Sequence, residues 1–253
     1  MEPIIFILGL CIGSFLNVCI YRIPESRSIV SPGSTCMVCH EPIRFYYNIP
    51  LISYLMLKGR CRNCHAPFSL RYPLVEMLSG LFALGAYIRW GMTSASLIYY
   101  GLIAVLMVIT FIDIDHYIIP DIISLPGIPA GVIACFFLPD MTFKSSVIGL
   151  LLGGGMLFAV AWIYEHLMHK EGMGGGDIKL LAMIGAFLGW KGVLVTLFTG
   201  SIIGTLAGGA VMLYTRSSSL KLKIPFGPFL AIGAMVYIFF GQELIFWYWN
   251  GLQ

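Results

Sequence analysis

Long apolar segments recur along this chain, and polar and charged residues collect between them. Apolar runs of about 18 or more residues are long enough to cross roughly 30 Å of hydrocarbon. The pattern therefore predicts an all-α, polytopic membrane protein of about eight transmembrane helices. The expected helices are Pro3–Tyr21, Pro73–Ile88, Ala95–Ile112, Ser124–Leu138, Ser145–Tyr164, Ile178–Trp190, Val193–Tyr214 and Pro225–Trp249.

The composition supports the same interpretation. The chain is 58% hydrophobic and 11% charged, whereas a soluble domain carries about 25% charged residues. This deficit excludes a soluble globular protein and makes the lipid bilayer the solvent for most of the chain. The first apolar run has no basic region before it and no small-residue cleavage site, so we expect it to be a retained helix rather than a signal peptide.

The basic residues predict an orientation in the membrane. Twelve of the 15 lysines and arginines fall in loops on one side of the expected helices, and cytoplasmic loops carry the excess of such residues. Both termini are therefore expected on the non-cytosolic side. The twelve are Arg22, Arg27, Arg44, Lys58, Arg60, Arg62, Arg71, Lys170, Lys179, Arg216, Lys221 and Lys223, against Arg89, Lys144 and Lys191 on the other side.

Two CxxC pairs lie in the long loop after the first helix. Cys36, Cys39, Cys61 and Cys64 offer four thiolates, the ligand set of a closed structural zinc site. Structural disulfides are disfavoured on the cytosolic side, and redox-active dithiols are the other alternative. The predicted organisation is a first transmembrane helix at 1–22, a small cytosolic metal-binding loop domain at 23–72, and a transmembrane domain at 73–253. The module is either purely structural or also binds substrate.

Acidic residues are scarce, and several lie at the expected cytosolic ends of helices. Asp113 and Asp115 end one apolar helix, and Asp177 follows the glycine run Gly174, Gly175 and Gly176. Carboxylates at membrane depth are costly and indicate a functional site. Two close aspartates share a proton, so one can act as general base and the other as general acid. The glycines leave the backbone free to adopt positive φ and to approach a substrate closely.

Other interpretations of these aspartates remain open at this point. Asp177 is well placed to cap the helix that follows it, and Asp113 and Asp115 are also compatible with solvated residues at a helix end. Lys179 can pair with any of them. Carboxylates at broken helices also bind cations in ion-coupled transporters, although we find no internal repeat of the kind such transporters carry.

Ordered motifs along the chain resemble those of the type IV prepilin peptidases, which are GxGD-type aspartic proteases of the bacterial inner membrane. The match runs from the first helix to the last and includes both CxxC pairs. The other motifs are Gly13-Ser14-Phe15-Leu16-Asn17-Val18, Tyr21-Arg22-Ile23-Pro24, Asn48–Tyr54, Lys58–Cys61, Arg71–Glu76, Asp113–His116, Ile119-Pro120-Asp121, Gly174–Leu180 and Pro225-Phe226-Gly227-Pro228.

The resemblance implies a function. Asp113 and Asp177 would form the catalytic dyad, with Asp115 and the three glycines supporting it, and the enzyme would cut the basic leader from prepilins or pseudopilins at the cytosolic membrane face. Many family members also methylate the new amino terminus with S-adenosylmethionine, and this cofactor is expected by resemblance alone. No nucleic-acid partner is expected. The alternatives are an ion-coupled transporter and a non-catalytic pilus or secretion assembly factor.

Overall fold

The computed structural model describes residues 1–39, 41–168, 174–215 and 224–250. The chain separates into two compact units, Met1–Val108 and Ile109–Gln253. Within the described ranges the regular elements are helices, with two isolated β-bridges and no strand. Several residues used in the sequence analysis lie outside these ranges: Lys170, Arg216, Lys221, Lys223 and the first part of the glycine-rich segment, 171–173.

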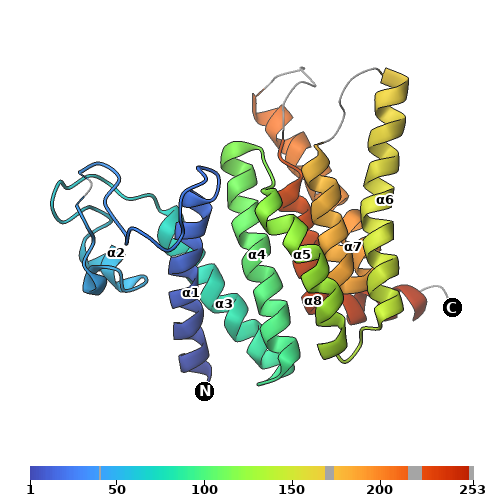
Figure 1. Ribbon diagram of the computed structural model, residues 1–253, viewed down its shortest axis with the longest axis horizontal. Helices are drawn as coiled ribbons and strands as arrows, with labels where there is room; N and C mark the ends of the chain where they lie inside the picture. The colour runs from blue at the N-terminus through green and yellow to red at the C-terminus, as the bar shows by residue number, and fades with distance from the viewer. Residues whose placement is uncertain (40, 169–173, 216–223, 251–253) are drawn as a thin grey trace. The chain divides into compact units, whose positions relative to one another are not determined.

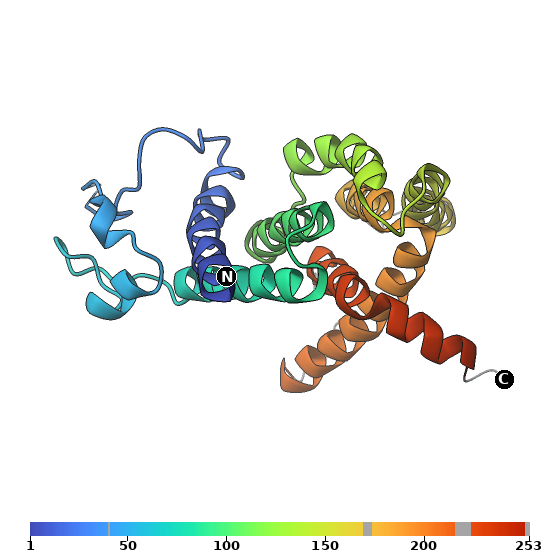
Figure 2. The same ribbon diagram turned by 90° about the horizontal axis from the view of Figure 1, so that it is seen from below.

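The first unit is built on a close pair of helices, α1 (Glu2–Arg22) and α3 (Arg71–Trp90) (Figures 1 and 2). Their backbones approach at the Gly9/Gly13 pair, where a Cβ on Gly13 would lie 2.7 Å from the Cα of Glu76. The Ser79 hydroxyl donates to the Gly9 carbonyl at 2.7 Å. Small residues therefore allow the contact, because glycines four residues apart on one helix let another helix backbone approach closely.

The segment between α1 and α3 carries little regular structure. It contains a 3-10 turn, Phe45–Tyr47, and the short helix α2, Ile52–Met56. The first part of α4 (Ser94–His116) completes this unit. A Ser79–Tyr100 hydroxyl contact of 2.8 Å joins α4 to α3.

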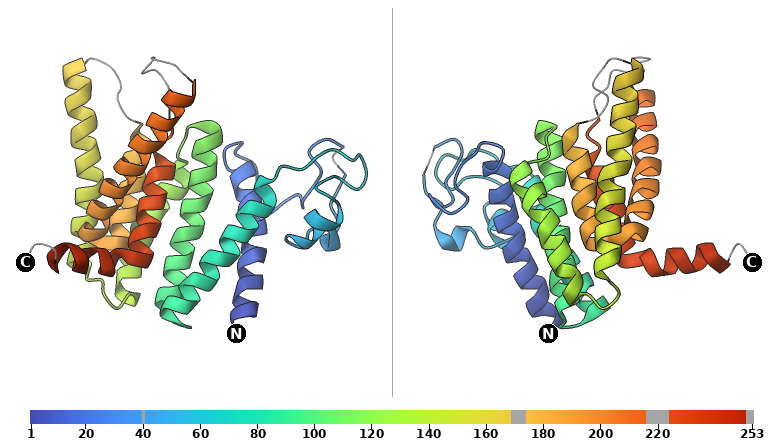
Figure 3. Two further views of the ribbon diagram at one scale, coloured as in Figure 1. Left: turned by 180° about the vertical axis from the view of Figure 1, so that it is seen from behind. Right: turned by 45° about the vertical axis from the view of Figure 1, so that its right-hand side comes forward.

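The second unit contains the end of α4, α5 (Asp121–Ala134), the 3-10 turn Cys135–Phe137, α6 (Phe143–Met168), α7 (Gly175–Thr215) and α8 (Gly227–Asn250). Helix α6 runs beside the first part of α7 (Figures 1 and 3). At their contact, Gly149 and Gly185 leave no room for a Cβ on either residue, because the backbone of the other lies too close. Helix α8 bends along its length (Figure 3).

Helix α7 is interrupted at Gly189, which has φ 71 and ψ −178. A β-carbon would be strained in this conformation, and the Ser145 hydroxyl occupies the space that it would need. The break falls one residue before the end of the predicted segment Ile178–Trp190, beside the gap predicted before Val193–Tyr214. The two predicted helices thus form one interrupted element.

The predicted count of about eight transmembrane helices is not confirmed. Among the described residues, five helices are long and apolar enough to cross a membrane: Glu2–Arg22, Ser94–His116, Phe143–Leu167, Gly175–Tyr214 and Gly227–Trp247. Helix α3 occupies a predicted span but includes Arg71, Glu76 and Arg89. Helix α5 has 14 residues, too few for a span on its own. Many large apolar side chains on the long helices are exposed, as expected for lipid-facing surfaces.

Candidate active site and metal centre

Asp113 lies near the carboxyl end of α4 and is only 5% exposed. Its Oδ2 accepts a hydrogen bond of 3.0 Å from the backbone N–H of Gly227, the first residue of α8. Because the first N–H groups of a helix have no partner within that helix, the start of α8 supplies a donor to this carboxyl group. The interpretation of Asp113 as a solvated helix end is therefore wrong.

Asp177 lies in the first turn of α7, which begins at Gly175. Its N–H donates to the Gly174 carbonyl at 3.2 Å. The alternative interpretation of Asp177 as the cap of this helix is wrong, because the helix starts two residues earlier, at Gly175. Gly175 and Gly176 are helical and are not among the described residues with positive φ, so they do not adopt the left-handed backbone that was expected for them.

The side chain of Ile119 links the segments that carry the two aspartates. A Cβ on Gly176 would lie 2.9 Å from the Cβ of Ile119, and a Cβ on Gly227 would lie 3.3 Å from its Cδ1. The two glycines therefore allow α7 and α8 to begin close to the loop after α4. Asp113 and Asp177 are thereby brought close enough for their charges to interact.

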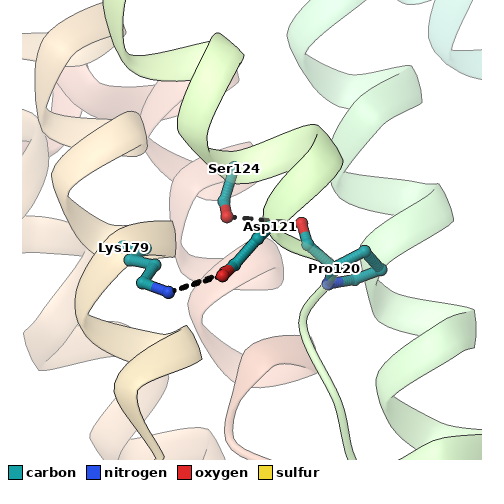
Figure 4. A network of polar contacts seen from close by, with 4 residues as sticks. All are labelled: Pro120, Asp121, Ser124 and Lys179. Carbon is teal, nitrogen blue, oxygen red and sulfur yellow. Dashed lines mark hydrogen bonds and ion pairs between the residues drawn. The ribbon is translucent and has the colours of Figure 1, made fainter.

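Asp115 and Lys179 occupy different positions from the two aspartates. Asp115 is exposed, two residues beyond the buried Asp113. Lys179 Nζ lies 2.8 Å from both carboxylate oxygens of Asp121, and this ion pair joins α7 to α5 (Figure 4). Lys179 is thus paired with Asp121 rather than with either aspartate of the predicted dyad.

The four cysteines of the loop converge, although 21 residues separate the two CxxC pairs. Each pair lies in a turn with the same two backbone hydrogen bonds and a β-bridge between the residues that flank it. The two turns have the same backbone structure because they share the sequence pattern Cys-x-x-Cys-His-x-Pro. The bonds are Cys36 N–H to Glu41 O and Cys61 N–H to Ala66 O, both 2.9 Å, and Ile43 N–H to Ser34 O and Phe68 N–H to Gly59 O, both 2.7 Å.

The sulfur positions suit a tetrahedral metal ion. All four Sγ atoms lie within 4.8 Å of one another, and the Cys36 and Cys64 sulfurs are 3.7 Å apart. Thiolates at about 2.3 Å from zinc in a tetrahedron are about 3.8 Å apart. Backbone N–H groups of Cys64 and Asn63 lower the pKa of the Cys61 thiol to about 7, whereas burial and the neighbouring sulfurs raise the pKa of the Cys64 thiol to about 11. The cluster can therefore bind a metal such as zinc.

Two residues that position the aspartates, Gly227 and Ile119, were not predicted from the sequence. Gly227 appeared only within the motif Pro225-Phe226-Gly227-Pro228, and Ile119 only within the motif Ile119-Pro120-Asp121. A half-buried apolar residue and a helix-initial glycine carry no chemical signal of their own. Their importance follows from contacts between segments that lie more than 50 residues apart in the chain.

Comparison with known proteins identifies relatives along nearly the whole chain. Residues 7–90 match the Bacterial Peptidase A24 N-terminal domain, and residues 100–209 match the Type IV leader peptidase family. The prepilin leader peptidase/N-methyltransferase of Aeromonas hydrophila is 37% identical, over 97% of this chain and 92% of the relative. That of Pseudomonas putida is 36% identical, over 96% of this chain and 94% of the relative. That of Myxococcus xanthus is 40% identical, over 83% of this chain and 63% of the relative. No solved structure matches significantly.

Proposed function

Because this chain belongs to the type IV leader peptidase family and is accordingly a peptidase, we propose that it removes the basic leader from type IV prepilins or pseudopilins. The relatives that match it along most of its length are named prepilin leader peptidases. Their names are the main support for this substrate class. The transporter and assembly-factor alternatives are not favoured, because these relatives are named as enzymes.

In this proposal Asp113 and Asp177 form the catalytic pair. The observation that carries it is their approach at one end of the second unit, where Asp113 is buried and bonded to Gly227 N–H. The hydrogen bond to Oδ2 fixes the Asp113 carboxyl group and leaves Oδ1 for a water molecule. One aspartate takes a proton from that water as it attacks the peptide carbonyl carbon, and the protonated partner donates a hydrogen bond to the carbonyl oxygen.

Breakdown of the resulting tetrahedral intermediate completes the reaction. The C–N bond breaks, the amine nitrogen takes a proton from a carboxyl group of the pair, and the leader leaves with a new carboxylate. The proton given to the amine replaces the one taken from the water molecule, so the pair again holds its single shared proton and titrates as one unit. Asp115 is proposed to support the site through its position beside Asp113, and Gly176 through close packing on Ile119.

The proposed location is the bacterial inner membrane, with the dyad at the cytosolic face and both termini on the other side. The distribution of basic residues supports this orientation. Within the second unit, Lys144 and Lys191 lie close in sequence to the contact between Ser145 and Gly189. Asp177 lies in the first turn of α7, before Gly189, and Asp113 lies near the end of α4.

We further propose that the enzyme methylates the new amino terminus. The relatives' names include N-methyltransferase, and the methyl group would come from S-adenosylmethionine. Cys36, Cys39, Cys61 and Cys64 would hold a structural zinc ion that replaces the hydrophobic core the loop lacks. The division into a first helix, a metal-binding domain at 23–72 and a peptidase domain at 73–253 belongs to the same proposal.

Mass spectrometry of a prepilin incubated with the purified enzyme in detergent tests the proposal. We expect a leader-sized mass loss, and a methyl increment that requires S-adenosylmethionine. Asp113→Asn and Asp177→Asn should each abolish the mass loss, because an amide can neither take nor share the proton. Asp140→Asn is the matched control, since Asp140 is exposed and bonded to Gln242. Normal cleavage by either dyad variant would remove that residue from the mechanism.

A further inference from the structure

Helix α2 (Ile52–Met56) turns an apolar face to the outside of the first unit. Ile52, Leu55 and Met56 are 54%, 74% and 76% exposed, and their spacing places them on one side of a helical turn. Single exposed apolar residues are ordinary on a protein surface. A contiguous group of them, by contrast, marks a contact with a membrane or a partner. The question is therefore what covers this face.

The opposite side of α2 is fixed to the rest of the unit. Ser53 is buried within it. The N–H of Leu51 donates to Oε2 of Glu76 on α3 at 2.9 Å, and the hydroxyl of Tyr54 donates to the carbonyl of Phe68 at 3.3 Å. Rotation of α2 about its axis would break these contacts. The apolar face is thus held outward by the packing of the unit itself.

The hydrogen bond between Leu51 and Glu76 also places α2 beside α1 rather than beyond its end. Glu76 packs against Gly13 of α1, which precedes the last residue of that helix, Arg22, by nine residues, or about 14 Å. Figures 1 and 3 show α2 beside α1, at a height between the two ends of that helix. Because α1 is long and apolar enough to cross a membrane, the exposed face of α2 lies at the depth of the bilayer.

The backbone around α2 suits contact with lipid. Polar backbone groups in hydrocarbon need partners within the protein, because no water is present there. The turn that follows α2 meets this requirement: the N–H groups of Lys58, Gly59 and Arg60 donate to carbonyls within residues 54–57, at 3.2, 2.9 and 3.1 Å. These donors need no water, so the turn can lie at the edge of the acyl chains.

Basic side chains follow the apolar face directly. Lys58 and Arg60 are exposed, and neither forms an ion pair with a carboxylate of the described residues. The segment 23–72 contains six lysines and arginines against two glutamates. Such charge is attracted to anionic lipid headgroups. It disfavours a second copy of the same face, and also the basic leader of the proposed substrate, because like charges repel.

We propose that α2 is an interfacial lipid anchor for the segment that carries the cysteines. Ile52, Leu55 and Met56 enter the leaflet next to the carboxyl end of α1, which the proposed orientation makes the cytosolic leaflet. Lys58 and Arg60 contact the phosphates of anionic lipids, while their apolar stems follow the acyl chains. Interfacial helices bind through buried apolar area together with attraction to anionic lipid. The cysteine segment is thereby held against the membrane surface.

Depth-dependent fluorescence quenching tests the apolar part of the proposal. A small fluorescent amino acid replaces Leu55 in the full-length enzyme, which is reconstituted into nanodiscs containing phosphatidylglycerol. The control carries the same residue in place of Glu41, which is exposed on the first cysteine turn. Bromine atoms on the acyl chains should quench the fluorophore at position 55 at least about twofold more than the one at position 41, because an interfacial helix buries its apolar face among the chains. Equal quenching at the two positions overturns the proposal.

The charged part of the proposal is tested by changing the lipid. Phosphatidylglycerol should increase the quenching at position 55 relative to nanodiscs of phosphatidylcholine alone. The double substitution Lys58→Gln and Arg60→Gln should abolish this increase, because the attraction to anionic lipid is lost. Lys144→Gln, a change at an exposed lysine of the second unit, should preserve it. An increase that survives the double substitution shows that Lys58 and Arg60 do not contact the lipid phosphates.

A measurement on the wild-type enzyme covers the case in which a substituted protein fails to fold. Lipid with a photoreactive diazirine in its acyl chain is activated in the nanodisc, and mass spectrometry maps the labelled residues. Residues 52–56 should carry label, as the spanning helices do. Label on the spanning helices alone overturns the proposal and shows that protein covers the face. These readouts are independent of cleavage, so the proposed function stands or falls separately.

Discussion

The backbone N–H of Gly227 donates a hydrogen bond to Oδ2 of Asp113 across 114 residues of sequence, at 3.0 Å. A Cβ on Gly227 would lie 2.6 Å from the same oxygen and 3.3 Å from Cγ of Asp113. Glycine is thus needed for the start of α8 to reach the carboxyl group. The contact fixes one member of the proposed dyad.

Gly227→Ala should therefore impair cleavage strongly. The methyl group must push Asp113 aside or lift α8, and a displacement of about 1 Å can cost about 100-fold in rate. A time course of leader loss by mass spectrometry measures the effect. Gly101→Ala is the control, because a Cβ at Gly101 on α4 meets nothing within 4 Å. A Gly227→Ala enzyme as fast as wild type would show that this hydrogen bond does not position the dyad.

Adjacent glycines before Asp177 should respond differently to substitution. A Cβ on Gly176 would lie 2.9 Å from Cβ of Ile119, whereas one on Gly175 meets nothing within 4 Å. Gly176→Ala should reduce the cleavage rate at least about tenfold through displacement of Asp177, and Gly175→Ala should reduce it less. Equal losses in the two variants would mean that backbone freedom of the glycine run, rather than close packing, is what the site requires.

Two glycines on α6 provide a matched pair for stability. A Cβ on Gly149 has no space against the backbone of Gly185 on α7, but one on Gly155 meets nothing within 4 Å. Gly149→Ala should destabilise the protein by about 1–3 kcal/mol, as expected for overpacking. Gly155→Ala should leave stability unchanged or raise it slightly, because alanine favours the helix. Thermal unfolding in detergent gives the comparison, and equal midpoints would contradict the close α6–α7 contact.

Removing a thiol of the cysteine cluster should remove the metal. Cys36→Ser should lower the zinc content of the purified protein from about one per chain towards zero, since structural zinc needs its full thiolate set. Lower pH should have the same effect, because protons compete with the metal for thiolates. Atomic emission spectroscopy measures the content. Cys11→Ser is the control, because Cys11 lies on α1 and is exposed. Full zinc occupancy in Cys36→Ser would exclude this site.

Local sequence patterns predicted the helices well, because a helix in lipid must satisfy its backbone within its own segment. The break at Gly189 also falls beside the gap that the apolar pattern left between two predicted helices. The number of membrane-spanning helices did not follow in the same way. Helix α3 carries charged residues and α5 is short. Apolar runs that look alike in the sequence therefore include some helices that are not long and apolar enough to cross a membrane.

The sequence by itself determined the chemistry available to this protein: four thiols in two equivalent turns, few carboxylates, and long apolar helices. Those properties depend on residue type and local spacing, which can be read directly from the sequence. Only the tertiary structure decided which groups meet. It buried Asp113 against Gly227, paired Lys179 with Asp121, and brought Glu76 into a hydrogen bond with the N–H of Leu51. Such relationships depend on packing between distant segments, where a difference of one methyl group opens or closes a contact.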